Sequence, residues 1–232
     1  MSSIALACNF KNEVENVRRI FNCVESVISE IVVVDCGSTD GTRELCKKLG
    51  ARVYDIGECP GYGQMRTITL HLCRTEWALI LDGDEMMDPP DVHKIPELTT
   101  RLQDSEFDVI QLPRQHFRSW DRSICENPDL SQYADWQNRL VRVNQKIHWI
   151  RRVHEQIRGI RKEYRDLSNP VIRHFGFMKT PERLQEIVDL CNRLWKQDQE
   201  NEDTYELEKL VGEASGPRYW KESPHYHEHK TG

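Results

Sequence analysis

Three short polar segments contain the residues of this chain whose types and spacing suit ligand chemistry. Each segment directly follows an apolar run, and the three are residues 9–13, 35–42 and 82–85. If the apolar runs are neighbouring parallel strands, their carboxyl ends meet at one edge of a sheet, which is where such sheets bind ligands. The sequence therefore predicts one polar, acidic site built from all three segments.

Asp82 and Asp84 are separated by a single glycine, and this spacing allows two carboxylates to approach one divalent cation. Mg²⁺ and Mn²⁺ take a few carboxylate ligands and complete their coordination shell with phosphate oxygens. A cation held here would bridge a diphosphate and stabilise it as a leaving group. The alternative is a plain turn, because Asp and Gly favour turns without any ligand.

The segment after the second apolar run points to a nucleotide. Asp35 ends a β-branched run, and its carboxylate can accept hydrogen bonds from a nucleobase or a ribose. Gly37 permits a tight turn, and Ser38 or Thr39 can cap the helix that comes next. A well-made strand–turn–helix without a ligand is the alternative. We favour binding, because that alternative gives the strand-end aspartate no structural purpose.

The elements that must position these residues alternate along the first hundred residues. Apolar and β-branched runs predict strands over residues 4–8, 31–34, 52–54 and 77–81. Apolar residues at helical spacing predict helices over residues 13–27, 39–49 and 64–73. This alternation implies a parallel sheet with right-handed crossovers, and hence an α/β fold.

The regular alternation of predicted strands and helices ends at about residue 105. Strands without full helices between them are expected over 107–112, 139–143 and 147–153, and residues 114–138 are expected to form a loop. A helix over 180–197 has Thr180 to cap it and Pro181 in its first turn. A second, acidic helix is expected over 202–212. We therefore expect a main domain over 1–178, a helical extension over 179–214 and a flexible tail over 215–232.

Composition and charge limit the class of protein. The 232 residues are enough for a domain with a real core. No apolar stretch approaches about 18 residues and no secretory signal is evident, so we expect a cytoplasmic protein without a transmembrane segment. The eight cysteines form no C-x-x-C pair and indicate reduced thiols. The net charge is −6, yet residues 139–173 contain ten Lys or Arg against three Asp or Glu, which predicts either an anionic ligand or a solvated surface.

Together these motifs resemble glycosyltransferase family 2, of GT-A fold. The likeness rests on segment 9–13, on the strand over 31–35 with the Gly-Ser-Thr-Asp-Gly-Thr run after it, and on residues 81–85. It is nearest to the small bacterial branch that includes lipopolysaccharide-core glucosyltransferases. That branch's downstream signatures resemble residues 139–142, 153–155 and 172–176, so that the likeness covers roughly residues 3–178.

The resemblance implies an inverting transferase that takes a sugar from a nucleoside diphosphate sugar, UDP-linked, with Mn²⁺ or Mg²⁺ as cofactor. The donor-binding residues that it implies are Asn12, Glu13, Asp35, Ser38, Arg66 and Asp82. The metal ligands would be Asp84 and Asp82, and His174 would complete the coordination, with a satisfied core histidine as the alternative. The sequence departs from the family pattern at residues 64–67, which read Gln-Met-Arg-Thr where Ala-Arg-Asn is usual.

An inverting transferase needs a general base for the acceptor hydroxyl, on the side opposite the leaving diphosphate. The second half of the chain would supply it. Glu155 is the first candidate and Asp135 the second. His154 would orient the acceptor or serve as the base itself. A salt bridge to a neighbouring arginine is the alternative interpretation of Glu155.

The acceptor and several alternatives stay open. A glycan, a lipid-linked sugar or a nucleic acid would offer the hydroxyl, and the basic segment 139–173 would bind its phosphate, as in a transferase acting on a modified DNA base. Trp120, Tyr133 and Trp136 would stack against sugars or anchor a small core. A nucleotidyltransferase and a non-catalytic sugar-nucleotide binding module are the other functions considered. Trp195 and the acidic second helix would support a homodimer.

Overall fold

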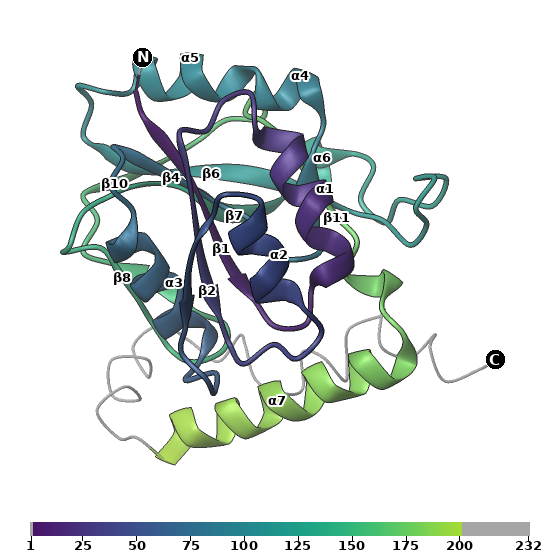
Figure 1. Ribbon diagram of the computed structural model, residues 1–232. Helices are drawn as coiled ribbons and strands as arrows, with labels where there is room; N and C mark the ends of the chain where they lie inside the picture. Colours follow the sequence, from purple (N-terminus) through teal and green to yellow (C-terminus); the bar gives the residue numbers. More distant parts are fainter. Residues whose placement is uncertain (1, 201–232) are drawn as a thin grey trace.

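Within residues 2–200, which the computed structural model describes, the chain forms a nine-stranded mixed sheet with helices on both faces (Figure 1). The strand order is β3-β2-β1-β4-β7-β6-β11-β5, and β10 lies beside β6. The strands of the sheet are β1 (Ile4–Phe10), β2 (Glu30–Asp35), β3 (Arg52–Asp55), β4 (Trp77–Ile80), β5 (Glu85–Met87), β6 (Phe107–His116), β7 (Asp135–Arg142), β10 (Lys162–Arg165) and β11 (Ile172–His174). A separate hairpin pairs β8 (His148–Ile150) with β9 (Gln156–Arg158).

The first half of the chain folds as its sequence predicts. β1 pairs in parallel with β2 on one side and with β4 on the other, and β2 pairs in parallel with β3. The helices between these strands are α1 (Val14–Val24), α2 (Thr42–Lys48) and α3 (Tyr62–Leu72). Val32, Val33 and Val34 are all buried, as a parallel strand covered on both faces requires.

The second half is more regular than the sequence indicates. β6 continues to His116 and β7 begins at Asp135, so both ends of the expected loop over 114–138 are strand. The two strands are antiparallel, with Arg114 opposite Asp135. The loop prediction was wrong there, because charged side chains that pair across two strands interrupt the apolar pattern by which a strand is detected.

β11 was also not predicted, and it matters for the site. This three-residue strand lies between β6, to which it is parallel, and β5, to which it is antiparallel. Its register sets His174 beside His116 on one side and beside Glu85 on the other. The end of β11 is thereby brought to the segment after β4.

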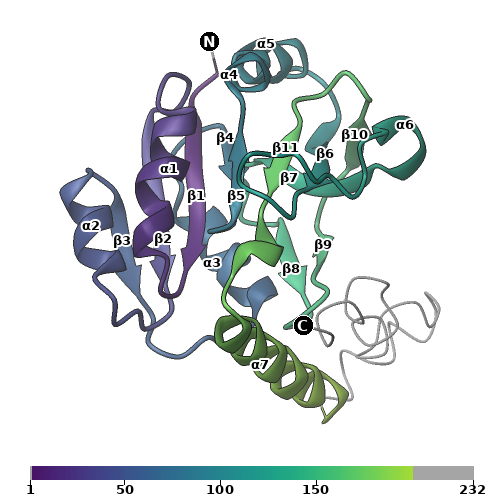
Figure 2. The ribbon, with the colours of Figure 1, turned by 90° about the vertical axis from the view of Figure 1, so that its right-hand side faces the viewer.

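Apolar layers cover both faces of the sheet. The helices that contribute to them are labelled in Figure 2. On one face α1 and α2 pack together with α4 (Pro89–Val92) and α5 (Lys94–Arg101). On the other face α3 packs with the β8–β9 hairpin. The carboxyl ends of the parallel strands then form the edge at which polar residues can gather.

The predicted helix over 180–197 is confirmed as α7 (Pro181–Glu200). The Thr180 hydroxyl caps it by accepting a hydrogen bond from the Arg183 amide at 3.3 Å. Figures 1 and 2 show α7 lying across the end of the molecule toward which β1 and β2 run. The acidic helix expected over 202–212 and the tail over 215–232 lie outside the described residues. No helix in the described part of the chain is long and apolar enough to cross a membrane.

Candidate active site

The three polar segments meet at one edge of the sheet, as predicted. The Asn12 amide donates to the Ser38 hydroxyl at 2.8 Å, and the Thr39 amide donates to the Asn12 side chain at 2.9 Å. The third segment joins them at Gly83, because a Cβ added there would lie 2.4 Å from Cδ of Glu13. A side chain at position 83 would therefore displace the Glu13 carboxylate from its place beside the segment after β4.

Asp35 has a structural role that the sequence analysis did not anticipate. Its carboxylate is fully buried and accepts hydrogen bonds from the Ser38 amide at 2.9 Å and from the Ser38 hydroxyl at 2.5 Å. These bonds fix the turn between β2 and α2. Binding of a base or ribose by Asp35 and Ser38 remains a prediction, and it would require a ligand to share or replace these bonds.

The Asp82 carboxylate is bound by two arginines instead of being free to bind a metal ion. Its Oδ2 accepts hydrogen bonds from Arg66 at 2.9 Å and from Arg139 at 2.5 Å. Burial disfavours the charged carboxylate, but the two guanidinium groups outweigh burial and hold the pKa of Asp82 well below its usual range. Asp82 is thus an ionised anchor for positive charge at the end of β4.

Arg66 connects this carboxylate to Glu155. Its Nε donates to Glu155 at 2.6 Å, which is the salt bridge named as the alternative interpretation of that residue. Burial raises the pKa of Glu155, but Arg66 outweighs burial, so that the pKa lies below its usual value. In this arrangement Glu155 is a weak base, and a catalytic role requires Arg66 to take another partner.

Glu85 is a site residue that sequence reasoning missed. Its side chain is fully buried, and its Oε1 accepts hydrogen bonds from Arg114 at 2.9 Å and from Arg139 at 2.7 Å. Its other oxygen accepts from the Asp82 amide at 3.1 Å. The available signal was a third acidic residue directly after the Asp-Gly-Asp motif. Its partners are distant in the sequence and could not be inferred from spacing.

Asp84 faces a histidine and a lysine from the C-terminal part of the chain. The His174 Nε2 lies 3.7 Å from Asp84 Oδ1, and the Lys179 ammonium forms an ion pair with Oδ2. Burial disfavours the charge of Asp84, but His174 and Lys179 lower its pKa to about 2. Gly176 gives the imidazole room, because a Cβ there would lie 2.5 Å from His174 Nε2.

The predicted metal ligands are only partly brought together. Asp84 and His174 face each other, but the Asp82 carboxylate is turned to its arginines, and the described residues contain no cluster of three metal-binding side chains. Two atoms that each bond one cation at about 2.1 Å are at most about 4.2 Å apart, so the Asp84–His174 pair has a suitable separation. A carboxylate and an imidazole suit Mn²⁺, and the lysine ammonium already places positive charge at this position.

The other two base candidates have different surroundings. Asp135 accepts hydrogen bonds from His116 at 2.9 Å and from Arg114 at 2.8 Å. Burial raises the pKa of Asp135, but His116 and Arg114 outweigh burial and hold that pKa well below its usual range. The His154 ring packs edge-on against Trp195 of α7, with 6.0 Å between the ring centroids. Burial lowers the pKa of His154.

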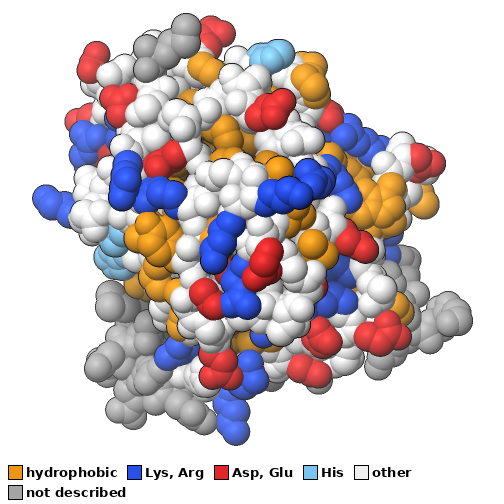
Figure 3. All heavy atoms as spheres, in the orientation of Figure 1, with side chains coloured by type: hydrophobic (Ala, Val, Ile, Leu, Met, Phe, Trp, Pro, Cys, Tyr) orange, Lys and Arg blue, Asp and Glu red, His pale blue; other side chains and the backbone are white. Residues whose placement is uncertain are grey.

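Part of the positive charge of the basic segment 139–173 is paired within the chain. Several of its cations have carboxylate partners within the chain, among them Arg139 with Asp82, Arg152 with Asp198, Arg161 with Asp108 and Arg173 with Asp88. On the face shown in Figure 3, basic and acidic side chains are interleaved. A local excess of charge in the sequence is here partly balanced by acidic residues from elsewhere, and the binding of an acceptor phosphate by this segment stays a prediction.

Two of the tryptophans expected to contact an acceptor or a second subunit pack within the chain. Trp120 stacks on Phe175 at 4.8 Å, and the Arg19 guanidinium lies 4.1 Å from the Trp120 ring centroid. Trp195 packs on His154, so it makes an internal contact. Tyr133 is exposed, and Trp120 also remains 48% exposed despite its contacts.

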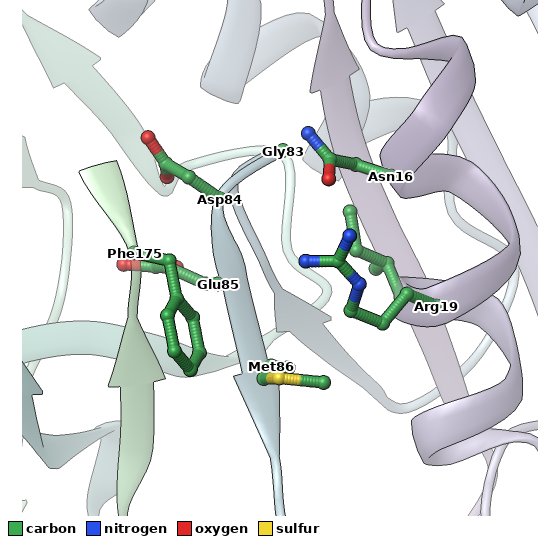
Figure 4. Close-up of a pocket in the computed structure, with 8 residues that line it drawn as sticks. Asn16, Arg19, Gly83, Asp84, Glu85, Met86 and Phe175 are labelled. Carbon is green, nitrogen blue, oxygen red and sulfur yellow. The ribbon is translucent and has the colours of Figure 1, made fainter. Parts of the chain in front are cut away.

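A small hollow opens beside Asp84 (Figure 4). Asp84 and Phe175 lie on one side of it, and Asn16 and Arg19 of α1 lie on the other. An adjoining hollow extends along α1 to Lys179 and Arg183 at the start of α7. Asp84 is therefore reached from the α1 side of the sheet edge.

The fold and the site define a class of protein. A mixed sheet that carries an Asp-x-Asp sequence after β4, with helices on both faces, is the α/β architecture of the GT-A fold. A solved structure of S. aureus TarS, residues 1–349 in complex with UDP, has a TM-score of 0.55 at 13% identity and covers 83% of this chain and 65% of that one. That likeness concerns the fold alone.

Sequence comparison identifies the family. The model of glycosyl transferase family 2 matches residues 9–167, which is more than half of the chain, so the chain belongs to this family. An uncharacterized glycosyltransferase of Rickettsia conorii is 37% identical over 94 residues, or 40% of this chain and 29% of that protein. The lipopolysaccharide core biosynthesis glycosyltransferase LpsC of Rhizobium meliloti is 34% identical over 82 residues, or 33% of this chain and 30% of that protein. The matched segments thus span under a third of these two relatives.

Proposed function

We propose that the chain is an inverting, metal-dependent glycosyltransferase that moves a sugar from a nucleoside diphosphate sugar to a hydroxyl group. The observation that carries the proposal is the pair formed by Asp84 and His174, which face each other across 3.7 Å at the end of β4. UDP is the expected nucleotide, because the TarS structure with a similar fold contains it. Membership of the family supports the transfer reaction.

The donor would lie along the sheet edge, with its diphosphate near Asp84. Asp84 and His174 would hold a Mn²⁺ or Mg²⁺ ion, which when bound would stabilise the charge of the leaving diphosphate. Arg66 is a second source of positive charge. Its Nη1 is buried, and no described residue accepts a hydrogen bond from it, so a phosphate oxygen would satisfy this donor. Asn12, Glu13, Asp35 and Ser38 would complete the nucleotide side.

In the transfer step, the acceptor oxygen would form a bond to the anomeric carbon while the bond from that carbon to the diphosphate breaks. The acceptor proton would pass to a carboxylate on the opposite face, and the nucleoside diphosphate would leave. Glu155 is our proposed base. A diphosphate that draws Arg66 away would remove the group that holds the pKa of Glu155 low, and Glu155 would become basic enough to accept the proton.

The first test is thermal stability with Mn²⁺ and a panel of nucleoside diphosphates, followed by donor turnover. We expect a metal-dependent stabilisation by UDP and release of UDP from its sugar donors. Release of pyrophosphate would instead identify a nucleotidyltransferase. Folded protein that no nucleotide stabilises would reject the proposed donor site and favour a non-catalytic module.

The Asp84→Asn variant tests the metal assignment within the same assays. It should lose metal-dependent turnover and Mn²⁺ binding while it remains folded, because the amide removes the charge that attracts the cation. Asp104→Asn is the matched control, since Asp104 is exposed and lies in the turn after α5. Full activity of Asp84→Asn would remove Asp84 from the mechanism.

A further inference from the structure

Four side chains form a continuous polar chain that ends at Asp84. Asp135 Oδ2 lies 2.9 Å from His116 Nε2, and His116 Nδ1 lies 2.9 Å from His174 Nδ1. The two rings are nearly perpendicular, at 87°, and His174 Nε2 then faces Asp84. The chain exists because β11 is inserted beside β6 with His174 opposite His116, while Asp135 begins the strand on the other side of β6.

The contacts determine where the protons lie. The Asp135 carboxylate is ionised and only accepts, so His116 carries a proton on Nε2. With this single proton, His116 accepts at Nδ1, and His174 donates from its own Nδ1. An imidazole with its one proton on Nδ1 has none on Nε2, so His174 Nε2 is left without a proton. The 3.7 Å separation from Asp84 is too long for a hydrogen bond, which agrees with a bare Nε2.

We propose that His116 and Asp135 are positioning residues that fix the tautomer and orientation of His174, so that its Nε2 lone pair points at the cation site beside Asp84. This inference rests on the proposed function and changes the role expected of Asp135. Its carboxylate is engaged by His116 and Arg114, and its effect on catalysis passes through His174 instead of through the acceptor proton. Mutation of residues that fix a metal-binding histidine in this way typically lowers metal affinity 10–100-fold.

The protonation pattern can be measured without any metal or substrate. Nitrogen-15 NMR of the histidine rings in the wild-type protein should show His174 protonated at Nδ1 and bare at Nε2, and His116 protonated at Nε2. In Asp135→Asn the amide is a poorer acceptor, and both rings should show mixed tautomers. A wild-type His174 with its proton on Nε2 would overturn the proposal.

Metal affinity provides the second readout. Calorimetric titration with Mn²⁺ in the presence of UDP should give a dissociation constant about 10–100-fold higher in His116→Gln and in Asp135→Asn than in the wild type. His148→Gln is the matched control, because His148 is exposed on β8 and should bind Mn²⁺ like the wild type. Affinities in both variants that match the wild type would refute a positioning role.

Two further outcomes distinguish the positioning role of Asp135 from a role as general base and from a failure of the proposed function. If Asp135→Asn lowered kcat while Mn²⁺ affinity stayed unchanged, Asp135 would be the general base, and the positioning role would be wrong. If the wild type bound no Mn²⁺ with any nucleoside diphosphate, the proposed function would fail. The tautomer measurement would still decide whether the polar chain exists, because it uses the protein alone.

Discussion

Arg139→Met tests the ion pairs that join Arg139 to Asp82 and Glu85. Arg139 is 3% exposed, and its Nη2 donates to Asp82 at 2.5 Å and to Glu85 at 2.7 Å. The variant keeps an apolar side chain of similar length but leaves the buried Glu85 carboxylate and the partly buried Asp82 carboxylate with one arginine fewer. Breaking a buried ion pair from one side costs about 3–5 kcal/mol. For a domain of this size, that loss lowers Tm by roughly 6–20 °C.

The assay is urea unfolding at pH 7 and at about pH 3, compared with Lys162→Met. Lys162 pairs with Glu106, and both side chains are more than half exposed, so its loss should cost under about 1 kcal/mol. Because the pKa of Asp82 is lowered in the folded protein, its contribution is present at neutral pH and is lost as pH falls below about 4. The difference between wild type and Arg139→Met should therefore shrink in acid. A loss below about 1 kcal/mol at pH 7, or an equal loss at both pH values, would refute this reasoning.

Three further predictions concern function and reactivity. Glu155→Gln should lower kcat by about 100-fold or more with little change in donor affinity, measured by steady-state kinetics and UDP titration; a larger effect on affinity would make Glu155 a binding residue. Lys179→Met should bind Mn²⁺ about tenfold more tightly than the wild type, since the metal ion no longer competes with an ammonium group on Asp84. Lys196 is exposed on α7, and the control variant Lys196→Met should bind Mn²⁺ like the wild type. Equal affinities of Lys179→Met and the wild type in calorimetry would contradict this prediction. The hydrogen bond from Cys36 lowers the pKa of Cys59 to about 7, so alkylation of Cys59 by iodoacetamide, followed by mass spectrometry, should rise through pH 7, and Cys36→Ala should shift that rise upward.

The first half of the fold and the meeting of the three polar segments were predictable because both depend on local pattern. Apolar runs and helical spacing mark β1 to β4 and α1 to α3, and strand order places the segments after β1, β2 and β4 at one edge. The hydrogen bonds between Asn12 and segment 35–42 confirm that convergence. Asp35 shows the limit of this reasoning, since the sequence contains no sign that Ser38 already satisfies its carboxylate.

The second half was harder to predict because its structure depends on pairings between distant charges. Glu85 meets Arg114 and Arg139, and no spacing rule links these three positions. β11 has three residues, too few for a periodic signal, yet it brings His174 to Asp84. The excess of positive charge over 139–173 suggested an external anion. Carboxylates of the same chain instead pair with several of these cations.

The distribution of charge explains why both candidate carboxylate bases are weak in the free protein. Asp82 and Glu155 share Arg66, and Asp135 shares Arg114 with Glu85. Each arginine thus binds two carboxylates. A change at one carboxylate therefore alters the pKa of the other, because both interact with the same guanidinium group. In the proposed function, a diphosphate entering this edge would compete for the same guanidinium groups, and Arg66 has a buried nitrogen that no described residue pairs. The donor itself would then release Glu155, so that basicity would arise only when a sugar is in place to react.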